Sequence, residues 1–357
     1  TCFDAKIYEA IEKSYLNSEL DSAPFGCALT DLNGGLCAVY SADLNEDINY
    51  ANTKLSPYSS LKPLSVYAPA IENNVANWSK VYEDSPYKQI MDENGELVNW
   101  PENATGTYTN SNTTVYQAIK ESINTVAVKC LDDYGVNNSI SFLKENFDMN
   151  LDYESKKATN EDEDEVIGNL AMGYLYDGVS VIDMAGYYQI FGNGGKYYKP
   201  EAITKIIDDH GKTIYTKNND YKQVVSEPTA FIMNELLQGV VQSGGTGAGA
   251  KMDDIEVGGK TGTGIANDCH WFVGFVSQYS CAVWHGGSLV DNYSPQIFKS
   301  IMQALKLDES VKYPKCREIK QAIYCADSGL LCNENCKRVD MGYYFADEII
   351  EKCKIHQ

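Results

Sequence analysis

The chain has 357 residues, of which 43% are hydrophobic and 11% aromatic, which is typical of a folded globular protein and not of a disordered one. Its 29 basic and 50 acidic residues give a formal net charge of −21, which argues against nucleic-acid binding because a phosphate backbone would be repelled. No run of about 20 apolar residues is present, so no segment is expected to span a membrane.

The N-terminal part predicts one helix and one hairpin. Apolar residues at helical spacing predict a helix over residues 6–15. Two short apolar runs, 25–30 and 36–40, flank an Asn-Gly turn and predict an antiparallel pair. A helical sequence pattern begins at Ser59 and is interrupted near Pro69. The polar region 72–112 is expected to be an extended loop.

The central and C-terminal parts alternate between helix and strand patterns. Residues 115–134 predict two helices broken at Ser122-Ile123-Asn124, and the acidic run 161–165 predicts a solvated loop. The remaining elements are expected helices over 181–191 and 228–241 and strands over 256–264, 271–275 and 281–285. Strands at both ends of the chain with helices between them predict an α+β fold in which these strands share one sheet.

Three short motifs occur in a fixed order: Ser59-x-x-Lys62, Ser122-x-Asn124 and Lys260-Thr261-Gly262. Each motif alone is an ordinary surface or turn pattern, and only the ordered set carries a functional signal.

The first motif predicts a nucleophile with its own base. Residues three apart share one face of a helix, so Lys62 can remove the proton of the Ser59 hydroxyl if its pKa is lowered. Lys260 would supply a nearby positive charge that lowers it. Free backbone N–H groups at the start of the helix can hold an oxyanion.

The second and third motifs predict the leaving-group and substrate contacts. Ser122 can relay a proton toward the leaving group, and the Asn124 amide can bind peptide groups of a substrate. Along the strand, Gly262 leaves room for a second backbone, so an extended peptide can pair with this edge. Thr261 and Thr263 offer hydroxyls for a terminal carboxylate, and the N–H of Thr263 is a second oxyanion donor.

Seven segments together resemble the transpeptidase domain of class A, or bifunctional, penicillin-binding proteins of Gram-positive type. These segments are Pro57-Tyr58-Ser59-Ser60-Leu61-Lys62-Pro63, Trp100-Pro101-Glu102-Asn103, Ser122-Ile123-Asn124-Thr125, Phe191-Gly192-Asn193-Gly194-Gly195, Gly245-Thr246-Gly247, Gly259-Lys260-Thr261-Gly262-Thr263 and Trp271-Phe272-Val273-Gly274-Phe275. Tyr58 and Leu61 depart from the family pattern of glycine and phenylalanine, which affects the rim of the pocket and not the chemistry.

The resemblance implies a fold shared with serine β-lactamases, in which helices flank an antiparallel sheet beside an all-helical subdomain. It implies a serine D,D-transpeptidase that cross-links peptidoglycan stem peptides through acyl-Ser59, needs no metal or cofactor and is blocked by β-lactams. Other cell-wall synthesis proteins are the implied partners. It places the domain on the extracytoplasmic face of the bacterial membrane, with an anchor and a glycosyltransferase domain upstream of this chain.

Three alternatives share parts of this pattern. A serine β-lactamase needs a residue that activates water, and Glu165, the nearest analogue, is better explained as part of the acidic loop. A D,D-carboxypeptidase would use water in place of an amine acceptor and remains open. A non-catalytic β-lactam sensor is disfavoured because all three motifs are intact.

Cysteines concentrate at the C-terminus, where five of the 11 lie in the last 42 residues. We therefore expect residues 1–308 to form the transpeptidase domain and 309–357 a cysteine-rich appendage stapled by disulfides. Zinc at Cys332-x-x-x-Cys336 and Cys353-x-x-His356 is the less favoured alternative. A second metal hypothesis, which ranks below ordinary surface histidines, groups four residues: Cys269, His270, Cys281 and His285.

Overall fold

A five-stranded antiparallel sheet organises the chain in the computed structural model, which describes residues 1–20, 23–43, 47–92, 94–159, 163–287 and 291–356. Across the sheet the strands follow the order β11 (Gly258–Thr263), β12 (Cys269–Phe275), β13 (Tyr279–Gly286), β1 (Phe25–Asp31) and β2 (Leu36–Ala42). The N-terminal strand β1 pairs directly with β13, with Cys27 opposite Val283. The prediction that strands from both ends of the chain share one sheet is confirmed.

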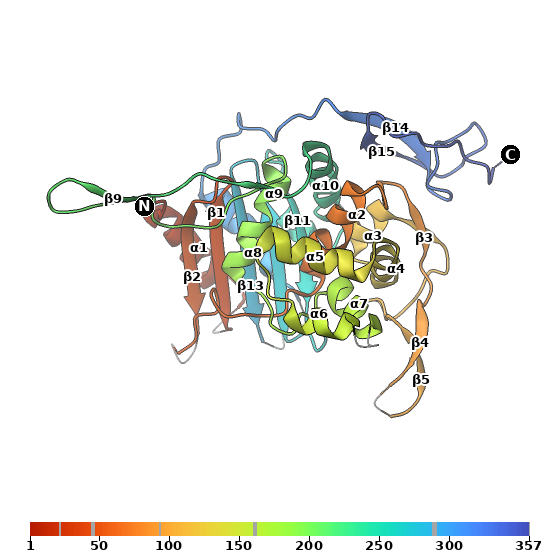
Figure 1. Cartoon of the computed structure of the whole chain (residues 1–357), viewed down its shortest axis with the longest axis horizontal. Helices are drawn as coiled ribbons and strands as arrows, with labels where there is room; N and C mark the ends of the chain where they lie inside the picture. The colour runs from red at the N-terminus through yellow and green to blue at the C-terminus, as the bar shows by residue number, and fades with distance from the viewer. Residues whose placement is uncertain (21–22, 44–46, 93, 160–162, 288–290, 357) are drawn as a thin grey trace.

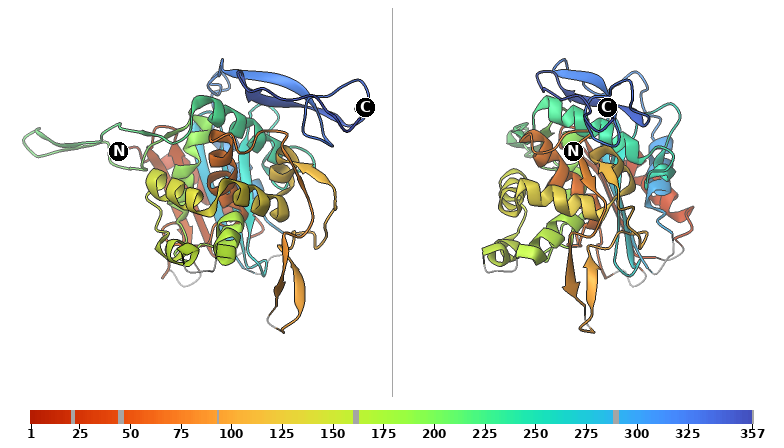
Figure 2. Two further views of the ribbon diagram at one scale, coloured as in Figure 1. Left: turned by 45° about the vertical axis from the view of Figure 1, so that its right-hand side comes forward. Right: turned by 90° about the vertical axis from the view of Figure 1, so that its right-hand side faces the viewer.

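The two faces of this sheet are covered by different helices, because successive side chains of a strand point to opposite sides. On one face Phe272 and Val283 pack with α1 (Ala5–Leu16) and α11 (Ser294–Ala304). On the other face Val273 and Ala282 belong to a larger core under α8 (Val181–Tyr187), α9 (Gln189–Gly192) and α10 (Glu227–Val240). Figure 2 shows helices on both sides of the sheet in its edge-on view.

The larger core continues into a helical region that carries part of the predicted site (Figure 1). Its helices are α2 (Ala68–Glu72), α3 (Val115–Glu121), α4 (Asn124–Tyr134), α5 (Val136–Phe147), α6 (Asp152–Thr159) and α7 (Glu163–Met172). The predicted break between two helices at 122–124 is confirmed, since α3 ends at Glu121 and α4 starts at Asn124. The expected helices over 181–191 and 228–241 also form, the first as the pair α8 and α9.

Two sequence predictions in this region are wrong. The segment 72–112 is not a plain loop, because β3 (Val81–Glu83) pairs with β6 (Asn112–Thr114) and β4 (Lys88–Met91) with β5 (Leu97–Trp100). The acidic run becomes helical from Glu163, and residues 161 and 162 lie outside the described residues. Cationic partners from other segments offset its charge: Asp164 pairs with Lys88, and Glu165 with Lys157.

The segment that starts at Ser59 is helical but irregular. A 3₁₀ turn, η1 (Tyr58–Leu61), is followed by a π-helical turn, η2 (Pro63–Tyr67), and then by α2. Pro63 and Pro69 each lack the N–H that a regular α-helix would use, which accounts for the changes in winding. Lys62 lies at the junction of the two turns and its side chain is fully buried.

The C-terminal segment forms a two-stranded hairpin of β14 (Ile319–Cys325) and β15 (Val339–Phe345), which lies beside α10 (Figure 1). Tyr343 packs its ring against Trp78 and Phe231, and the Tyr344 hydroxyl donates to Ser79 Oγ at 2.9 Å. The remaining short elements are η3 (Ala248–Ala250) and the pairs β7 (Lys196–Tyr197) with β10 (Lys222–Gln223) and β8 (Lys205–Ile207) with β9 (Thr213–Thr216). Within the described residues, no helix has the length and apolar character needed to cross a membrane.

Candidate active site

Backbone contacts from three neighbouring segments fix the turn that carries Ser59. The N–H of Tyr58 donates to the carbonyl of Gly173 at 3.0 Å, and the Tyr188 hydroxyl donates to the carbonyl of Ser60. Trp271 on β12 donates its indole N–H to the carbonyl of Ser56 at 3.0 Å. Because these contacts hold the main chain, the half-buried Ser59 side chain is presented on a rigid support.

Two buried lysines converge on Ser122. The Lys62 ammonium donates to Asn124 Oδ1 at 2.6 Å and to the Ser122 carbonyl at 2.9 Å, and lies 3.5 Å from Ser122 Oγ. The Lys260 ammonium donates to the same Oγ at 2.8 Å and to the Thr261 carbonyl at 3.2 Å. The structure therefore brings residues of all three predicted motifs into a single hydrogen-bonded cluster.

Burial makes both lysines easier to deprotonate, because a charged ammonium loses hydration in the protein interior. It lowers the pKa of Lys62 well below its ordinary value, and the positive charge of Lys260 lowers it further. Burial also lowers the pKa of Lys260 to about 7. Both groups therefore lose a proton more readily than an exposed lysine, as a general base and a proton relay must.

The junction of α3 and α4 places Ser122 and Asn124. Ser122 caps α3 in the left-handed conformation, with φ 62°. Asn124 opens α4, and its side-chain amide donates to the carbonyl of Glu102 at 2.7 Å. Its backbone N–H donates to Asn103 Oδ1 at 2.9 Å. The Asn124 side chain is thereby oriented with its oxygen toward Lys62.

A polar network behind this junction is a positioning element that sequence reasoning missed. Asp84 Oδ1 accepts hydrogen bonds from Asn103 and Thr125, each at 2.7 Å. Although burial acts to raise the pKa of Asp84, hydrogen bonds led by the one from Thr125 leave it lowered, so this carboxylate stays charged. Asn103 stood in the quoted Trp-Pro-Glu-Asn segment, but Asp84 lies in a region taken as loop, and no local pattern marks it.

The strand β11 lies at the edge of the sheet and forms the opposite wall. Thr261 Oγ1 donates to Thr246 Oγ1 at 2.7 Å, which brings the Gly245-Thr246-Gly247 segment into the site. A Cβ on Gly262 would lie 2.5 Å from the carbonyl oxygen of Pro57. The turn that carries Ser59 is thus one backbone that needs the space at Gly262, and the pairing of a substrate peptide with this edge stays a prediction.

These residues line one open pocket of about 550 Å³. Five of the predicted site residues form part of its wall: Ser59, Ser122, Asn124, Thr261 and Thr263. The wall also includes Thr246 from the quoted Gly245-Thr246-Gly247 segment, and residues that the sequence did not single out, among them Tyr174 and Asn292. Lys62 and Lys260 lie behind Ser122 and are not exposed to the pocket. The pocket thus offers a hydroxyl nucleophile, a second hydroxyl and hydrogen-bonding threonines beside a concealed pair of lysines.

Residues 28–303 match the family model described as the penicillin binding protein transpeptidase domain. The chain belongs to this family. The predicted family and fold class are confirmed, and so is the prediction of a penicillin-binding protein transpeptidase domain.

Relatives with similar sequences carry penicillin-binding protein names. Penicillin-binding protein 1A of Clostridium acetobutylicum is 35% identical over 264 residues, covering 71% of this chain and 31% of the relative. Penicillin-binding protein 4 of Bacillus subtilis is 33% identical over 260 residues, covering 70% of this chain and 38% of the relative. The matched part of the chain thus spans about a third of the length of these relatives.

Solved structures support the fold at lower identity. Penicillin-binding protein 1A from Haemophilus influenzae has a TM-score of 0.74 at 20% identity, covering 93% of this chain and 54% of that one. The D,D-transpeptidase domain of a peptidoglycan glycosyltransferase from Eggerthella lenta has a TM-score of 0.70 at 19% identity, covering 85% and 81%. The chain therefore shares the fold of the matched parts of these structures.

The cysteine and histidine predictions have mixed outcomes. All 11 cysteines are free thiols in the structure, so the expected disulfides do not form. His270 and His285 face each other across β12 and β13, with ring centroids 4.7 Å apart, but both are buried and the expectation of surface histidines was wrong. Cys281 lies four residues from His285, about 13 Å along a strand, and its sulfur faces Cys27 at 3.7 Å. This second group therefore does not converge on a metal site.

Proposed function

We propose that this domain is a serine D,D-transpeptidase that joins peptidoglycan stem peptides through an acyl-Ser59 intermediate. The observation that carries the proposal is the contact of both buried lysines with Ser122 Oγ, in the wall of the pocket that Ser59 also lines. This arrangement combines a nucleophile, a base of lowered pKa and a second hydroxyl for proton transfer. It needs no cofactor.

Acylation begins with proton transfer from Ser59 to neutral Lys62, which follows Ser59 by three residues across the η1 turn. The Ser59 oxygen attacks the carbonyl carbon between two terminal D-alanine residues of a stem peptide. The oxyanion of the tetrahedral intermediate faces the backbone N–H groups of Ser59 and Thr263. Ser122 then protonates the departing amine of D-alanine and recovers a proton from Lys260, to which it is hydrogen bonded.

The donor peptide lies against β11, whose outer edge is not paired with another strand of the described sheet. The hydroxyls of Thr261 and Thr263 and the positive charge of Lys260 hold the terminal carboxylate. A substrate amide takes the place of the Glu102 carbonyl at the Asn124 side chain. Asn124 thereby serves two purposes: its side-chain N–H binds the substrate amide, and its side-chain oxygen accepts a hydrogen bond from Lys62.

Transfer to an amine, rather than to water, is the second part of the proposal. Glu165, the residue considered for a β-lactamase, contacts Tyr153 at 2.9 Å and Lys157 at 3.1 Å and does not line the Ser59 pocket. A β-lactam that acylates Ser59 therefore has no water-activating group at that position. We propose that β-lactams form long-lived adducts and that a stem-peptide amine is the natural acceptor.

The proposed substrate, peptidoglycan, determines where in the cell the reaction would take place. We propose that the domain acts at the extracytoplasmic face of the bacterial membrane, alongside other cell-wall synthesis proteins. A membrane anchor and a glycosyltransferase domain upstream remain predictions. The length of the relatives, about three times the matched segment, is consistent with such additional parts.

Fluorescent penicillin tests the acyl-enzyme. We expect stoichiometric, slowly released labelling of the wild-type chain and none of Ser59→Ala, while Ser141→Ala, an exposed serine on α5, labels normally. Rapid release would identify a β-lactamase instead. Labelling that persists in Ser59→Ala, or no labelling of a folded wild type, would overturn the assignment of the nucleophile.

A peptide substrate tests the acceptor. We expect a donor ending in D-Ala-D-Ala, incubated with a stem peptide bearing a free amine, to give a cross-linked product detectable by mass spectrometry. Only the shortened, hydrolysed donor would identify a D,D-carboxypeptidase.

A further inference from the structure

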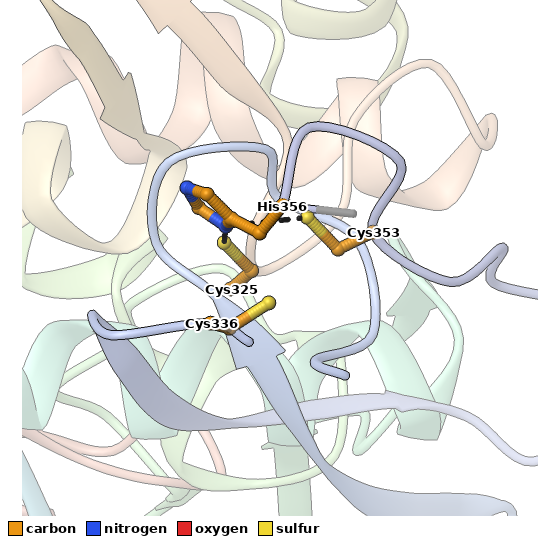
Figure 3. A group of neighbouring side chains, drawn as sticks. All are labelled: Cys325, Cys336, Cys353 and His356. Atoms are coloured by element: carbon orange, nitrogen blue, oxygen red, sulfur yellow. Dashed lines mark hydrogen bonds between the residues drawn. The ribbon is translucent and has the colours of Figure 1, made fainter. Parts of the chain in front are cut away.

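Four metal-binding side chains meet at the end of the C-terminal hairpin where residues 326–338 connect its two strands. The Sγ atoms of Cys325, Cys336 and Cys353 and a ring nitrogen of His356 all lie within 4.8 Å of one another. Figure 3 shows the three thiols and the imidazole directed toward a common centre. Cys325 ends β14, Cys336 lies in the connection to β15, and the other two come from the last residues of the chain.

The spacing of these atoms matches a tetrahedral zinc site. Zinc at about 2.3 Å from sulfur and about 2.0 Å from nitrogen places a sulfur and a nitrogen ligand about 3.5 Å apart in a tetrahedron. His356 Nδ1 lies 3.4 Å from Cys325 Sγ and 3.6 Å from Cys353 Sγ. Three thiolates and one imidazole form a ligand set typical of closed structural zinc sites.

Polar residues next to the cluster orient its side chains as residues around a bound metal do. The other ring nitrogen of His356, Nε2, lies 3.5 Å from a carboxylate oxygen of Asp327. A carboxylate at that position orients the imidazole and directs its free nitrogen toward a metal. Asp327 is itself held by Arg338 at 2.8 Å.

Asn333 fixes the two loops that carry the ligands. Its side-chain amide donates to the carbonyls of Cys353 at 3.0 Å and His356 at 2.8 Å. Its backbone N–H points to Cys336 Sγ at 3.4 Å, a contact that stabilises a thiolate. The ligand loops are therefore tied together by groups other than the ligands.

We propose that Cys325, Cys336, Cys353 and His356 bind one structural Zn²⁺ ion. A disulfide is a poorer account of the same geometry, because it would use two of the three thiols and leave the third beside the imidazole. The zinc expectation from the sequence is revised in one respect: Cys325 replaces Cys332, which contributes no atom to the cluster.

Zinc at this position would attach the end of the chain to the domain. The turn after Cys325 contacts the main domain directly: the Asp327 carbonyl accepts from the Asn112 side chain at 2.7 Å, and the Gly329 carbonyl from Ser79 Oγ at 2.6 Å. The metal would hold the last residues against this turn. We accordingly treat 309–357 as an appendage whose outer end is stabilised by metal ligation.

Metal analysis of the purified chain, prepared without chelator, tests the proposal. We expect about one zinc per chain by mass spectrometry. Zinc should be lost in Cys325→Ser and in Cys353→Ser and retained in Cys316→Ser and Cys332→Ser, whose thiols lie outside the cluster. Alkylation of the denatured wild type without reductant should count 11 free thiols.

Two measurements on folded protein keep the proposal open to refutation if a cysteine variant does not fold. Cobalt(II) added to metal-stripped wild type should give the thiolate charge-transfer and visible bands of tetrahedral coordination. Asp327→Asn should weaken zinc affinity about 10- to 100-fold in competition with a chelator, while the exposed Asp347→Asn does not. Absence of zinc and of the cobalt spectrum, a disulfide mapped between two of the three ligand cysteines, or zinc that survives loss of Cys325 would each overturn it.

Discussion

The catalytic centre and the C-terminal appendage both bring together residues that are distant in sequence, but by different means. At the centre, Lys62 and Lys260 are buried without an ion pair among the described residues, because a large apolar core and fixed carbonyls surround them. The appendage is a two-stranded hairpin with apolar side chains left in solvent, such as Ile349 at 94% exposure. Such a small core stabilises its loops poorly. In the appendage, three thiols and an imidazole come together at the loops that the core does not hold.

Polar groups therefore serve different purposes in the catalytic centre and in the appendage. In the centre, loss of hydration makes the lysines reactive, since it lowers their pKa values. In the appendage, the role proposed for the grouped thiols and imidazole is to bind a structural metal. Substitutions in the two regions should therefore have separable effects on acylation and on stability.

Replacement of Lys62 should have the largest effect on chemistry. We expect Lys62→Met to slow acylation by penicillin about 1000-fold, because general base catalysis contributes about 10²- to 10⁴-fold. The rate of fluorescent penicillin labelling under single-turnover conditions measures it. Lys251→Met, an exposed lysine, is the control and should label at the wild-type rate. A loss of less than tenfold would show that another group removes the proton of Ser59.

The sequence alone was sufficient to predict the site residues that belong to short motifs, each confined to a few neighbouring residues. The Ser59, Ser122 and Lys260 motifs each sit on a recognisable helix start, helix break or strand, and period-2 and helical patterns predicted the strands and helices that carry them. The strands at both ends of the chain were placed in one sheet for the same reason.

What the sequence could not provide depends on contacts between distant segments. Asp84 supports the Ser122 junction from a region without periodic pattern, and Gly262 is small because Pro57 lies against it. Cys325 joins Cys353 and His356 only through the fold of the hairpin, so spacing along the chain suggested the wrong cysteine.

Lys260 should tune the pH dependence of the reaction. Its charge lowers the pKa of Lys62, so in Lys260→Gln that pKa should rise toward its ordinary value. At a given pH less Lys62 is then neutral, and the pH at which acylation reaches half its maximum should move upward. The plateau rate should fall about tenfold, as expected for a weakened hydrogen bond to Ser122. Labelling rates across pH 5–10 measure both values.

The direction in which the pH midpoint of acylation moves in Lys260→Gln distinguishes the possible roles of Lys260. An unchanged midpoint with a lower plateau would mean that Lys260 acts only as a hydrogen-bond donor to Ser122. A downward shift would contradict the assignment of Lys62 as the base.

Removal of the appendage metal should have the smallest effect on catalysis. The connection from the cluster to the site runs through Asp327 and Asn112 on β6 to α3, which ends beside Ser122. Ser122 is also held by both lysines, and α3 packs on α10, so its position does not depend on the appendage. We expect chelation to change the acylation rate less than about threefold, while hydrogen exchange of residues 325–356 rises because bound metal stabilises only the folded form. A large loss of acylation with an intact domain would mean that the two regions are coupled through α3, and that the appendage belongs to the catalytic machinery.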